Sequence, residues 1–294
     1  MLRYLRTMLE LVRFSHTVFA LPFALVAATM ATIVDRSHGG GFRLLDWIGI
    51  LLCMVFARST AMAVNRLADR HYDAANPRTA NRHLPRGIVS VRQVAVFAAA
   101  CAAGFVASCA LFIASNDNWL PLYLALPVLG FICGYSYSKR FTALSHLWLG
   151  ASLMLAPIAA WIAIRGTIEW PPIVLGAAVL SWVAGFDIIY ACQDVEFDRS
   201  ARLHSIPARL GTARALKVAA GLHALTMLFL LLLPLTFPLG WLYLSGLGAI
   251  AGLLIYEHWL VRPDDLGRAN VAFFHVNAVI SVGLLLVTWA DLAL

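Results

Sequence analysis

Long apolar stretches alternate with short polar segments along the whole chain. Each stretch is close to the roughly 20 residues that an α-helix needs to cross the hydrocarbon core of a bilayer. Turn-forming residues interrupt the stretches, as in His38-Gly39-Gly40-Gly41 and Trp170-Pro171-Pro172. The pattern predicts an all-α polytopic membrane protein with about nine transmembrane helices, over residues 15–35, 46–66, 90–114, 119–137, 143–164, 171–193, 213–234, 236–256 and 270–291. We treat residues 1–294 as a single transmembrane domain.

The composition agrees with this prediction. Hydrophobic residues make up 61% of the chain and charged residues only 13%, whereas soluble domains have about 25% charged residues. The first apolar stretch, from about Thr17 to Val34, is longer than that of a signal peptide, and no small-residue cleavage pattern follows it. We therefore expect it to stay as a span. The five cysteines form no CxxC pair, so neither a disulfide framework nor a zinc site is predicted.

The basic residues fall mainly on one side of the predicted helices. Of the 22 Lys and Arg residues, Arg36, Arg43 and Arg165 lie on the opposite side and Arg58 lies within a span, which leaves 22 − 4 = 18 on one face. The positive-inside rule makes this face cytoplasmic. We expect a multi-pass protein of a bacterial-type inner membrane, with the N-terminus and the active-site face cytoplasmic and the C-terminus on the other side. The net charge of +7 then reflects topology, and no nucleic-acid partner is expected.

Two polar stripes end the second and sixth predicted spans. Each has one polar residue followed by two aspartates at intervals of four, namely Asn65, Asp69 and Asp73, and then Tyr190, Asp194 and Asp198. Residues four apart share a helix face, where like charges repel unless a cation lies between them. Carboxylates are suitable ligands for Mg²⁺, which also binds substrate phosphates. The stripes therefore predict Mg²⁺ bound against a diphosphate.

Basic residues follow the stripes and supply candidate phosphate ligands. Arg82 lies in the polar loop after the first stripe, and Lys139 and Arg140 end the fourth predicted span. Arginine and lysine both bind phosphate oxygens, and arginine does so bidentately. For Arg78, Arg86 and Arg92, which also lie in this region, the positive-inside topology is as good an explanation as phosphate binding.

As a set, these motifs resemble the UbiA superfamily of intramembrane prenyltransferases. The first stripe matches the family pattern NxxxDxxxD. The second stripe matches the family's second motif, a polar residue followed by DxxxD. Tyr135 and Lys139 match a YxxxK element, and Arg82, Pro85 and Gly87 match the loop after the first motif. The resemblance implies a helical bundle around a central cavity, with the prenyl tail in a groove open to the lipid bilayer. It implies Mg²⁺ ligands at Asn65, Asp69, Asp73, Asp194 and Asp198, and substrate-binding residues at Arg82, Tyr135, Lys139, Arg140 and Tyr190.

The opening segment, residues 13–23, is similar to the 4-hydroxybenzoate polyprenyltransferase-like branch of this superfamily. The branch implies transfer of a polyprenyl group from a polyprenyl diphosphate to a small aromatic acid. We favour 4-hydroxybenzoate, which gives 3-polyprenyl-4-hydroxybenzoate in ubiquinone biosynthesis. The alternative acceptor is 1,4-dihydroxy-6-naphthoate, in menaquinone biosynthesis. His204-Ser205-Ile206-Pro207 stands where proteobacterial ubiquinone-type enzymes usually have a Lys-Ser-Thr-like element, so both acceptors stay open.

Three further residues are candidates for contact with the aromatic acid. Arg13 and His16, near the start of the first span, could meet its carboxylate. Asp187 lies two turns before Asp194 on nearly the same helix face, and an acid within a span is a functional candidate. We expect it to orient the acceptor hydroxyl or to take the ring proton, with Arg58 as its candidate partner.

Two other classes of membrane protein carry intramembrane acids. Secondary transporters place them near the midplane on broken helices, whereas most of the aspartates here lie at span ends, which leaves a transporter as a remote alternative. CDP-alcohol phosphotransferases need an Asp-Gly pair, and the chain has none. No oligomeric state is predicted.

Overall fold

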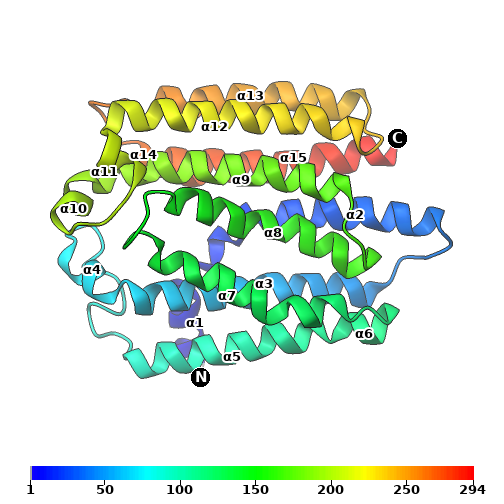
Figure 1. The fold of residues 1–294 in the computed structure, drawn as a ribbon, viewed down its shortest axis with the longest axis horizontal. Coiled ribbons are helices and arrows are strands. Elements are labelled where there is room, and N and C mark those ends of the chain that lie inside the picture. Colours follow the sequence, from blue (N-terminus) through cyan, green and yellow to red (C-terminus); the bar gives the residue numbers. More distant parts are fainter. Residues whose placement is uncertain (1) are drawn as a thin grey trace. The chain divides into compact units, whose positions relative to one another are not determined.

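The computed structural model describes the backbone of residues 2–294 and the side chains of residues 6–13 and 17–294. Within this part of the chain every regular element is a helix (Figure 1). Eight helical segments are long and apolar enough to cross a membrane: Thr17–Ser37, Leu44–Ala68, Val91–Asn116, Leu120–Ser138, Ser145–Arg165, Trp170–Ser200, Thr212–Leu235 and Ala269–Ala293. The predicted all-α, polytopic fold is confirmed.

The remaining predicted span, 236–256, is also helical. It is found as helix α13, Trp241–Leu260, which is 20 residues long but, unlike the other eight, does not reach the mean hydropathy of a candidate span. Glu257 and His258 near its end lower its hydropathy. A short 3₁₀ helix, Leu233–Leu235, separates α13 from the helix before it, at the proline-containing boundary expected from the sequence.

The chain forms two compact units. The first contains residues 1–17 and 43–137, and the second contains residues 18–42 and 138–294. The first unit is built from α1 (Leu2–Leu11), α3 (Leu44–Ala68), α4 (Arg70–Ala75), α5 (Val91–Cys109), α6 (Leu111–Asn116) and α7 (Leu120–Ser138). Helices α3 and α5 pack side by side within it (Figure 1).

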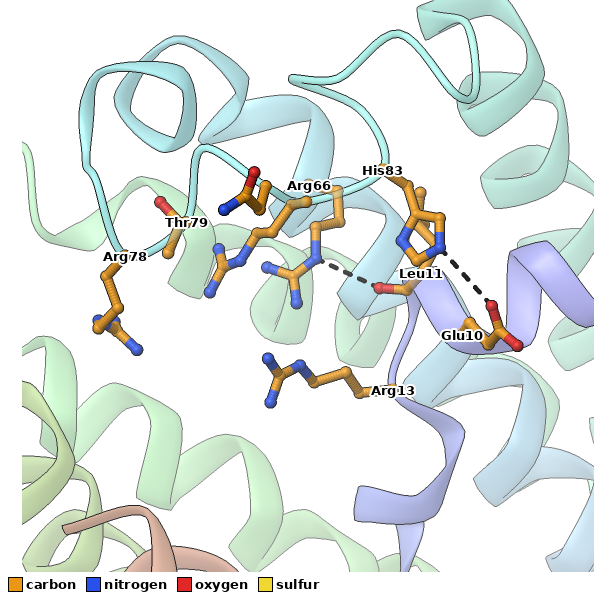
Figure 2. A pocket seen from close by; sticks show the side chains of 9 residues that line it. Glu10, Leu11, Arg13, Arg66, Arg78, Thr79 and His83 are labelled. Atoms are coloured by element: carbon orange, nitrogen blue, oxygen red, sulfur yellow. Dashed lines mark hydrogen bonds and ion pairs between the residues drawn. The ribbon is translucent and has the colours of Figure 1, made fainter. Parts of the chain in front are cut away.

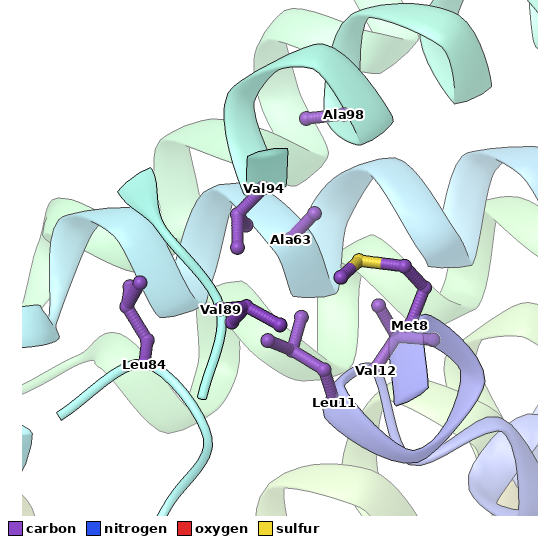
Figure 3. Packing of buried hydrophobic residues seen from close by; sticks show 8 residues of the cluster. All are labelled: Met8, Leu11, Val12, Ala63, Leu84, Val89, Val94 and Ala98. Atoms are coloured by element: carbon purple, nitrogen blue, oxygen red, sulfur yellow. The ribbon is translucent and has the colours of Figure 1, made fainter. Parts of the chain in front are cut away.

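A hydrophobic cluster ties the short helix α1 to α3 and α5 in the first unit. Figure 3 shows its eight buried residues: Met8, Leu11, Val12, Ala63, Leu84, Val89, Val94 and Ala98. Helix α5 begins at a capping box, in which the Ser90 hydroxyl accepts from the Gln93 backbone N–H and the Gln93 side chain accepts from the Ser90 N–H. The cluster and the cap hold the second half of the loop that follows the first aspartate stripe, through Leu84, Val89 and Ser90.

The second unit is centred on α9 (Trp170–Ala191), which packs against α8 (Ser145–Arg165) and α12 (Thr212–Leu232) (Figure 1). Its other long helices are α2 (Leu21–Ser37), α13 and α15 (Asn277–Ala293). Short helices α10 (Val195–Ser200), α11 (Ile206–Leu210) and α14 (Ala269–Val271) connect them. The Trp182 indole N–H of α9 donates to the side-chain oxygen Oδ1 of Asn277 at 2.7 Å, which gives this buried indole a partner inside the unit.

Close packing of α8 on α9 requires a glycine at position 150. A Cβ added there would collide with the backbone carbonyl oxygen of Leu180, which cannot rotate away. We expect Gly150→Ala to lower the free energy of unfolding by about 1–3 kcal/mol, as overpacking usually does. Gly221→Ala in α12 is the matched control, because its added Cβ meets nothing within 4 Å. Thermal unfolding in detergent checks this, and equal melting temperatures for the two variants would contradict it.

Candidate functional site

The first aspartate stripe lies where α3 ends and α4 begins. The backbone N–H of Asp69 donates to the carbonyl of Asn65, and that of Asp73 donates to the carbonyl of Asp69, so the four-residue spacing is kept across the helix boundary. The Asn65 side-chain amide also donates to Asp69 Oδ2 at 2.8 Å. Asp73 is buried, and its Oδ1 accepts from Arg82 Nη1 at 2.7 Å. The predicted stripe and its predicted arginine are therefore in direct contact.

Each member of this ion pair has a buried atom without a hydrogen bond among the described residues. These atoms are Asp73 Oδ2 and Arg82 Nε. A buried polar atom that lacks a partner costs about 1–3 kcal/mol, so it usually has a functional explanation. In this ion pair, a carboxylate oxygen, which is a hard metal ligand, and a cationic guanidinium N–H group both lack a hydrogen bond.

A basic cavity of about 320 Å³ lies beside this stripe in the first unit (Figure 2). Its lining includes the three arginines Arg13, Arg66 and Arg78 in addition to Arg82. Arg66 is buried, and its Nε donates to the backbone carbonyl of Leu11 at 3.3 Å. Several guanidinium groups around one space repel one another unless an anion lies between them. The cavity is therefore suited to a carboxylate or a phosphate.

Arg13 has a backbone conformation that arginine rarely adopts. Its φ is +47°, in the left-handed region, directly after α1. This conformation costs roughly 1–3 kcal/mol in a non-glycine residue and often occurs at functional sites. The predicted carboxylate ligand thus lines an anion-suited cavity. His16, the other predicted ligand, lies outside the residues whose side chains are described.

One acidic side chain also borders the cavity. Glu10 forms an exposed ion pair with Arg6 at 2.9 Å and lies 3.7 Å from His83 Nε2. The hydrogen bond from Arg6, with a smaller contribution from His83, lowers the pKa of Glu10. Glu10 is therefore ionised at neutral pH and balances part of the positive charge.

The second stripe lies at the end of α9 in the second unit. The helix tightens into a 3₁₀ turn, Cys192–Asp194, before α10 begins. Asp194 and Asp198 are both buried, while Glu196, which lies two residues from each on a different helix face, is exposed. Lys139 Nζ lies 3.8 Å from Asp198 Oδ2, which has no hydrogen bond among the described residues. A buried aspartate with an unpaired oxygen beside a cation therefore occurs in both units.

Three other predicted substrate ligands have different surroundings. The ring of Tyr190 packs on Phe273, with 4.3 Å between the ring centroids. Tyr135, near the end of α7, is half-buried, and Arg140 is exposed. Their substrate-binding roles stay predictions.

The structure gives Asp187 a partner that the sequence did not suggest. Asp187 Oδ2 lies 2.7 Å from Nδ1 of His146, which is fully buried in the first turn of α8. Arg58 belongs to α3, and its partnership with Asp187 stays a prediction. The antiparallel order of consecutive spans was the available signal, because it brings the start of α8 to the end of α9. Arg66 was likewise missed as a cavity residue, since its position at a span end is explained by topology alone.

The described residues contain no group of three or more His, Cys, Asp or Glu side chains placed to hold a metal ion. Mg²⁺ does not require such a group, because it typically uses one or two carboxylates and completes its shell with water and substrate phosphates. The buried oxygens of Asp73 and Asp198 that lack a hydrogen bond are hard oxygen ligands of the kind that Mg²⁺ prefers. The residues present therefore fit Mg²⁺ bound together with a diphosphate.

The fold and these stripes define a multi-pass helical membrane protein with an aspartate-rich, anion-binding site. The model of the UbiA prenyltransferase family matches residues 19–279. The chain therefore belongs to this family and is a membrane-embedded prenyltransferase, which confirms the predicted resemblance.

Curated relatives and solved structures agree with this assignment. The chain is 30% identical to a 4-hydroxybenzoate octaprenyltransferase of Hydrogenovibrio crunogenus, over 81% of this chain and 82% of the relative. It is also 30% identical to the enzyme of the same name from Marinobacter nauticus, over 81% and 79%. The apo structure of a UbiA homolog from Aeropyrum pernix K1 superposes with a TM-score of 0.82 at 32% identity, covering 95% of this chain and 98% of that one. A UbiA homolog from Archaeoglobus fulgidus bound to DMAPP and Mg²⁺ shares the fold, with a TM-score of 0.70 at 22% identity and coverage of 98% and 99%.

Proposed function

We propose that the protein transfers a polyprenyl group from a polyprenyl diphosphate to C3 of 4-hydroxybenzoate and releases diphosphate, a step of ubiquinone biosynthesis. The relatives that share about 30% identity over four fifths of the chain carry this activity in their names. They support 4-hydroxybenzoate over 1,4-dihydroxy-6-naphthoate as the acceptor.

The observation that carries the proposal is the arrangement repeated in the two units. In each, a motif aspartate is buried, is close to a basic side chain and has one carboxylate oxygen without a hydrogen bond. Asp73 has Arg82 as its neighbour, and Asp198 has Lys139. We assign Asn65, Asp69, Asp73, Asp194 and Asp198 as the residues that hold Mg²⁺ and, through it, the diphosphate.

The reaction breaks the bond between C1 of the prenyl chain and the diphosphate oxygen, and the electron pair leaves with the diphosphate. Carbon C3 of the acceptor ring bonds to C1 and then loses its proton. Bound Mg²⁺ supplies positive charge to the leaving diphosphate. Arg82 and Lys139 stabilise the same developing charge as fixed cations in a partly dry site. Tyr135, Tyr190 and Arg140 are assigned to binding of the diphosphate substrate.

The acceptor carboxylate is assigned to the basic cavity of the first unit. Arg13 lines this cavity and is the predicted ligand of the carboxylate. We expect Arg13→Ala to raise the KM for 4-hydroxybenzoate by about 10- to 100-fold, since a hydrogen bond to a charged group is worth roughly 1.5–3 kcal/mol. The KM for the polyprenyl diphosphate should change little.

Steady-state kinetics in detergent or nanodiscs tests this expectation. Arg6→Ala is the matched control, because Arg6 is on the same N-terminal segment but its side chain is 82% exposed and pairs only at the surface. An unchanged KM for 4-hydroxybenzoate in the Arg13 variant would remove Arg13 from the acceptor site.

Prenyl transfer in membranes containing the protein tests the function itself. Each acceptor is offered separately with a polyprenyl diphosphate and Mg²⁺. Prenylation of 4-hydroxybenzoate supports the proposal, and prenylation of the dihydroxynaphthoate alone contradicts the acceptor. The proposal places the N-terminus and both stripes on the cytoplasmic face and the C-terminus on the opposite face, in keeping with the basic residues.

A further inference from the structure

In the second unit, the imidazole of His146 contacts one side chain and one backbone N–H group. The ring lies in the first turn of α8 and has no solvent exposure. Its Nδ1 is 2.7 Å from Asp187 Oδ2 on α9, and its Nε2 accepts from the backbone N–H of Ile206 at 3.4 Å. Three segments that are far apart in the sequence therefore meet at one buried imidazole.

These contacts fix the tautomer of the imidazole. The backbone N–H of Ile206 can only donate, so Nε2 must be the unprotonated, accepting nitrogen. The proton of the ring is then on Nδ1, which donates to Asp187 Oδ2. The hydrogen bond from His146 therefore fixes the orientation of the Asp187 side chain.

The Asp187 carboxylate has acceptor capacity that the fold does not use. His146 is the hydrogen-bond partner of Asp187 among the described residues, and the Asp187 side chain keeps 14% exposure within a mostly buried helix. A carboxylate can accept about four hydrogen bonds. An intramembrane acid that is held in place and still accessible is unlike a residue that only supports packing.

The segment His204–Pro207 connects this arrangement to the diphosphate end of the site. The backbone N–H of His204 donates to the carbonyl of Lys139 at 2.6 Å, and Ile206 contacts His146 two residues later. The Ser205 hydroxyl caps α11 by accepting from the Ala208 N–H at 3.2 Å. The segment that departs from the usual family element is therefore in contact with both Lys139 and His146.

We infer that His146 is a positioning residue, which holds the Asp187 carboxylate so that it accepts the hydrogen bond of the acceptor's ring hydroxyl and selects aromatic acids that carry one. This inference rests on the proposed function and deepens it. Asp187 lies seven residues before Asp194, which is roughly 10 Å along the helix axis. That separation is comparable to the combined length of a diphosphate and one aromatic ring.

The proposed contact activates the ring carbon that attacks. As C3 bonds to C1 of the prenyl chain, the hydroxyl proton moves to Asp187 and the ring takes a ketone form. The C3 proton then passes to the released diphosphate, and Asp187 returns its proton to the oxygen. The phenol is restored, and the carboxylate and imidazole end in their starting states.

The decisive experiment compares two acceptors that differ only at the hydroxyl, 4-hydroxybenzoate and 4-methoxybenzoate. The ratio of their kcat/KM values is measured for wild type, Asp187→Asn, His146→Phe and His146→Asn. We expect Asp187→Asn to lower the hydroxyl preference by about 10- to 100-fold, and His146→Phe to lower it by about tenfold. His146→Asn should stay near wild type, because its amide N–H takes the place of Nδ1–H.

The ratio separates positioning from a general loss of structure. Damage to the fold lowers both kcat/KM values and leaves their ratio unchanged, and such a result in the Asp187 variant would overturn the inference. A lowered ratio in Asp187→Asn without one in His146→Phe would overturn the role of His146. If the wild type prenylates no aromatic acid, the proposed function itself fails, which is a distinct result.

Discussion

Asp73→Asn is expected to lower kcat for prenyl transfer by about 10²–10³-fold, and Asp198→Asn is expected to have a similar effect, as loss of one preorganised electrostatic group commonly does. Asparagine keeps the size of the side chain but removes its charge. In each variant the buried unpaired oxygen is no longer part of a carboxylate. The neighbouring cation, Arg82 or Lys139, also loses its carboxylate partner. Initial rates with saturating substrates and Mg²⁺ measure the effect.

Glu196→Gln is the matched control for these two variants. It removes one negative charge two residues from Asp198, but its side chain is exposed and lies off the motif face. Its rate should stay within about twofold of wild type, as expected for a surface charge. Thermal unfolding of all three variants shows whether each is folded. A folded Asp73→Asn protein with the wild-type rate would mean that the first stripe does not bind the diphosphate.

The positions of the membrane spans could be predicted because their signal is local. A span needs about 20 consecutive apolar residues, and this requirement can be read within one window of the sequence. Residues 119–137 and 143–164 are found as the spans Leu120–Ser138 and Ser145–Arg165. Helix α13 does not reach the mean hydropathy of these spans, because Glu257 and His258 stand in its final turn.

Two other local features could not be predicted in this way. Helix α1 has only ten residues, and its apolar face is explained by the cluster it forms with α3 and α5, not by a span (Figure 3). The π-helix Ala272–Val276 depends on Asn277, whose side-chain amide donates to the carbonyls of Ala272 and Phe273. That amide is itself held by Glu257 of α13, 20 residues away.

The candidate site was predictable where its residues follow one helix. The four-residue spacing of the aspartates directly predicts a shared face, and nearby Arg82 was identified from the same loop. Contacts between helices carry no such signal. Asp187 and His146 are 41 residues apart, and the contact between Arg66 and Leu11 spans 55. Charge alone suggested Arg58 as a candidate partner of Asp187, whereas the packing of α8 on α9 brings the His146 imidazole to it.

Removal of divalent metal is expected to abolish prenyl transfer, with a loss of more than about 10³-fold in rate. The diphosphate is highly charged, and Arg82 already shares its charge with Asp73, while Lys139 is close to Asp198. The chain's own cations are thus partly neutralised by the motif aspartates, so the basic side chains alone supply too little positive charge for the leaving group. Chelation with EDTA followed by dialysis and rate measurement gives the metal-free value.

Readdition of metal then identifies the ion and its ligands. Mg²⁺ should restore the rate, whereas Ca²⁺ should restore it poorly, because the larger ion prefers more ligands at longer distances. Asp198→Asn should need about tenfold more Mg²⁺ for half of its own maximal rate, while Glu196→Gln should need the wild-type concentration. Full activity after exhaustive chelation would contradict the role of the metal. An unchanged Mg²⁺ requirement in Asp198→Asn would mean that Asp198 is not a Mg²⁺ ligand. Loss of a carboxylate that only paired with Lys139 would leave the Mg²⁺ requirement unchanged.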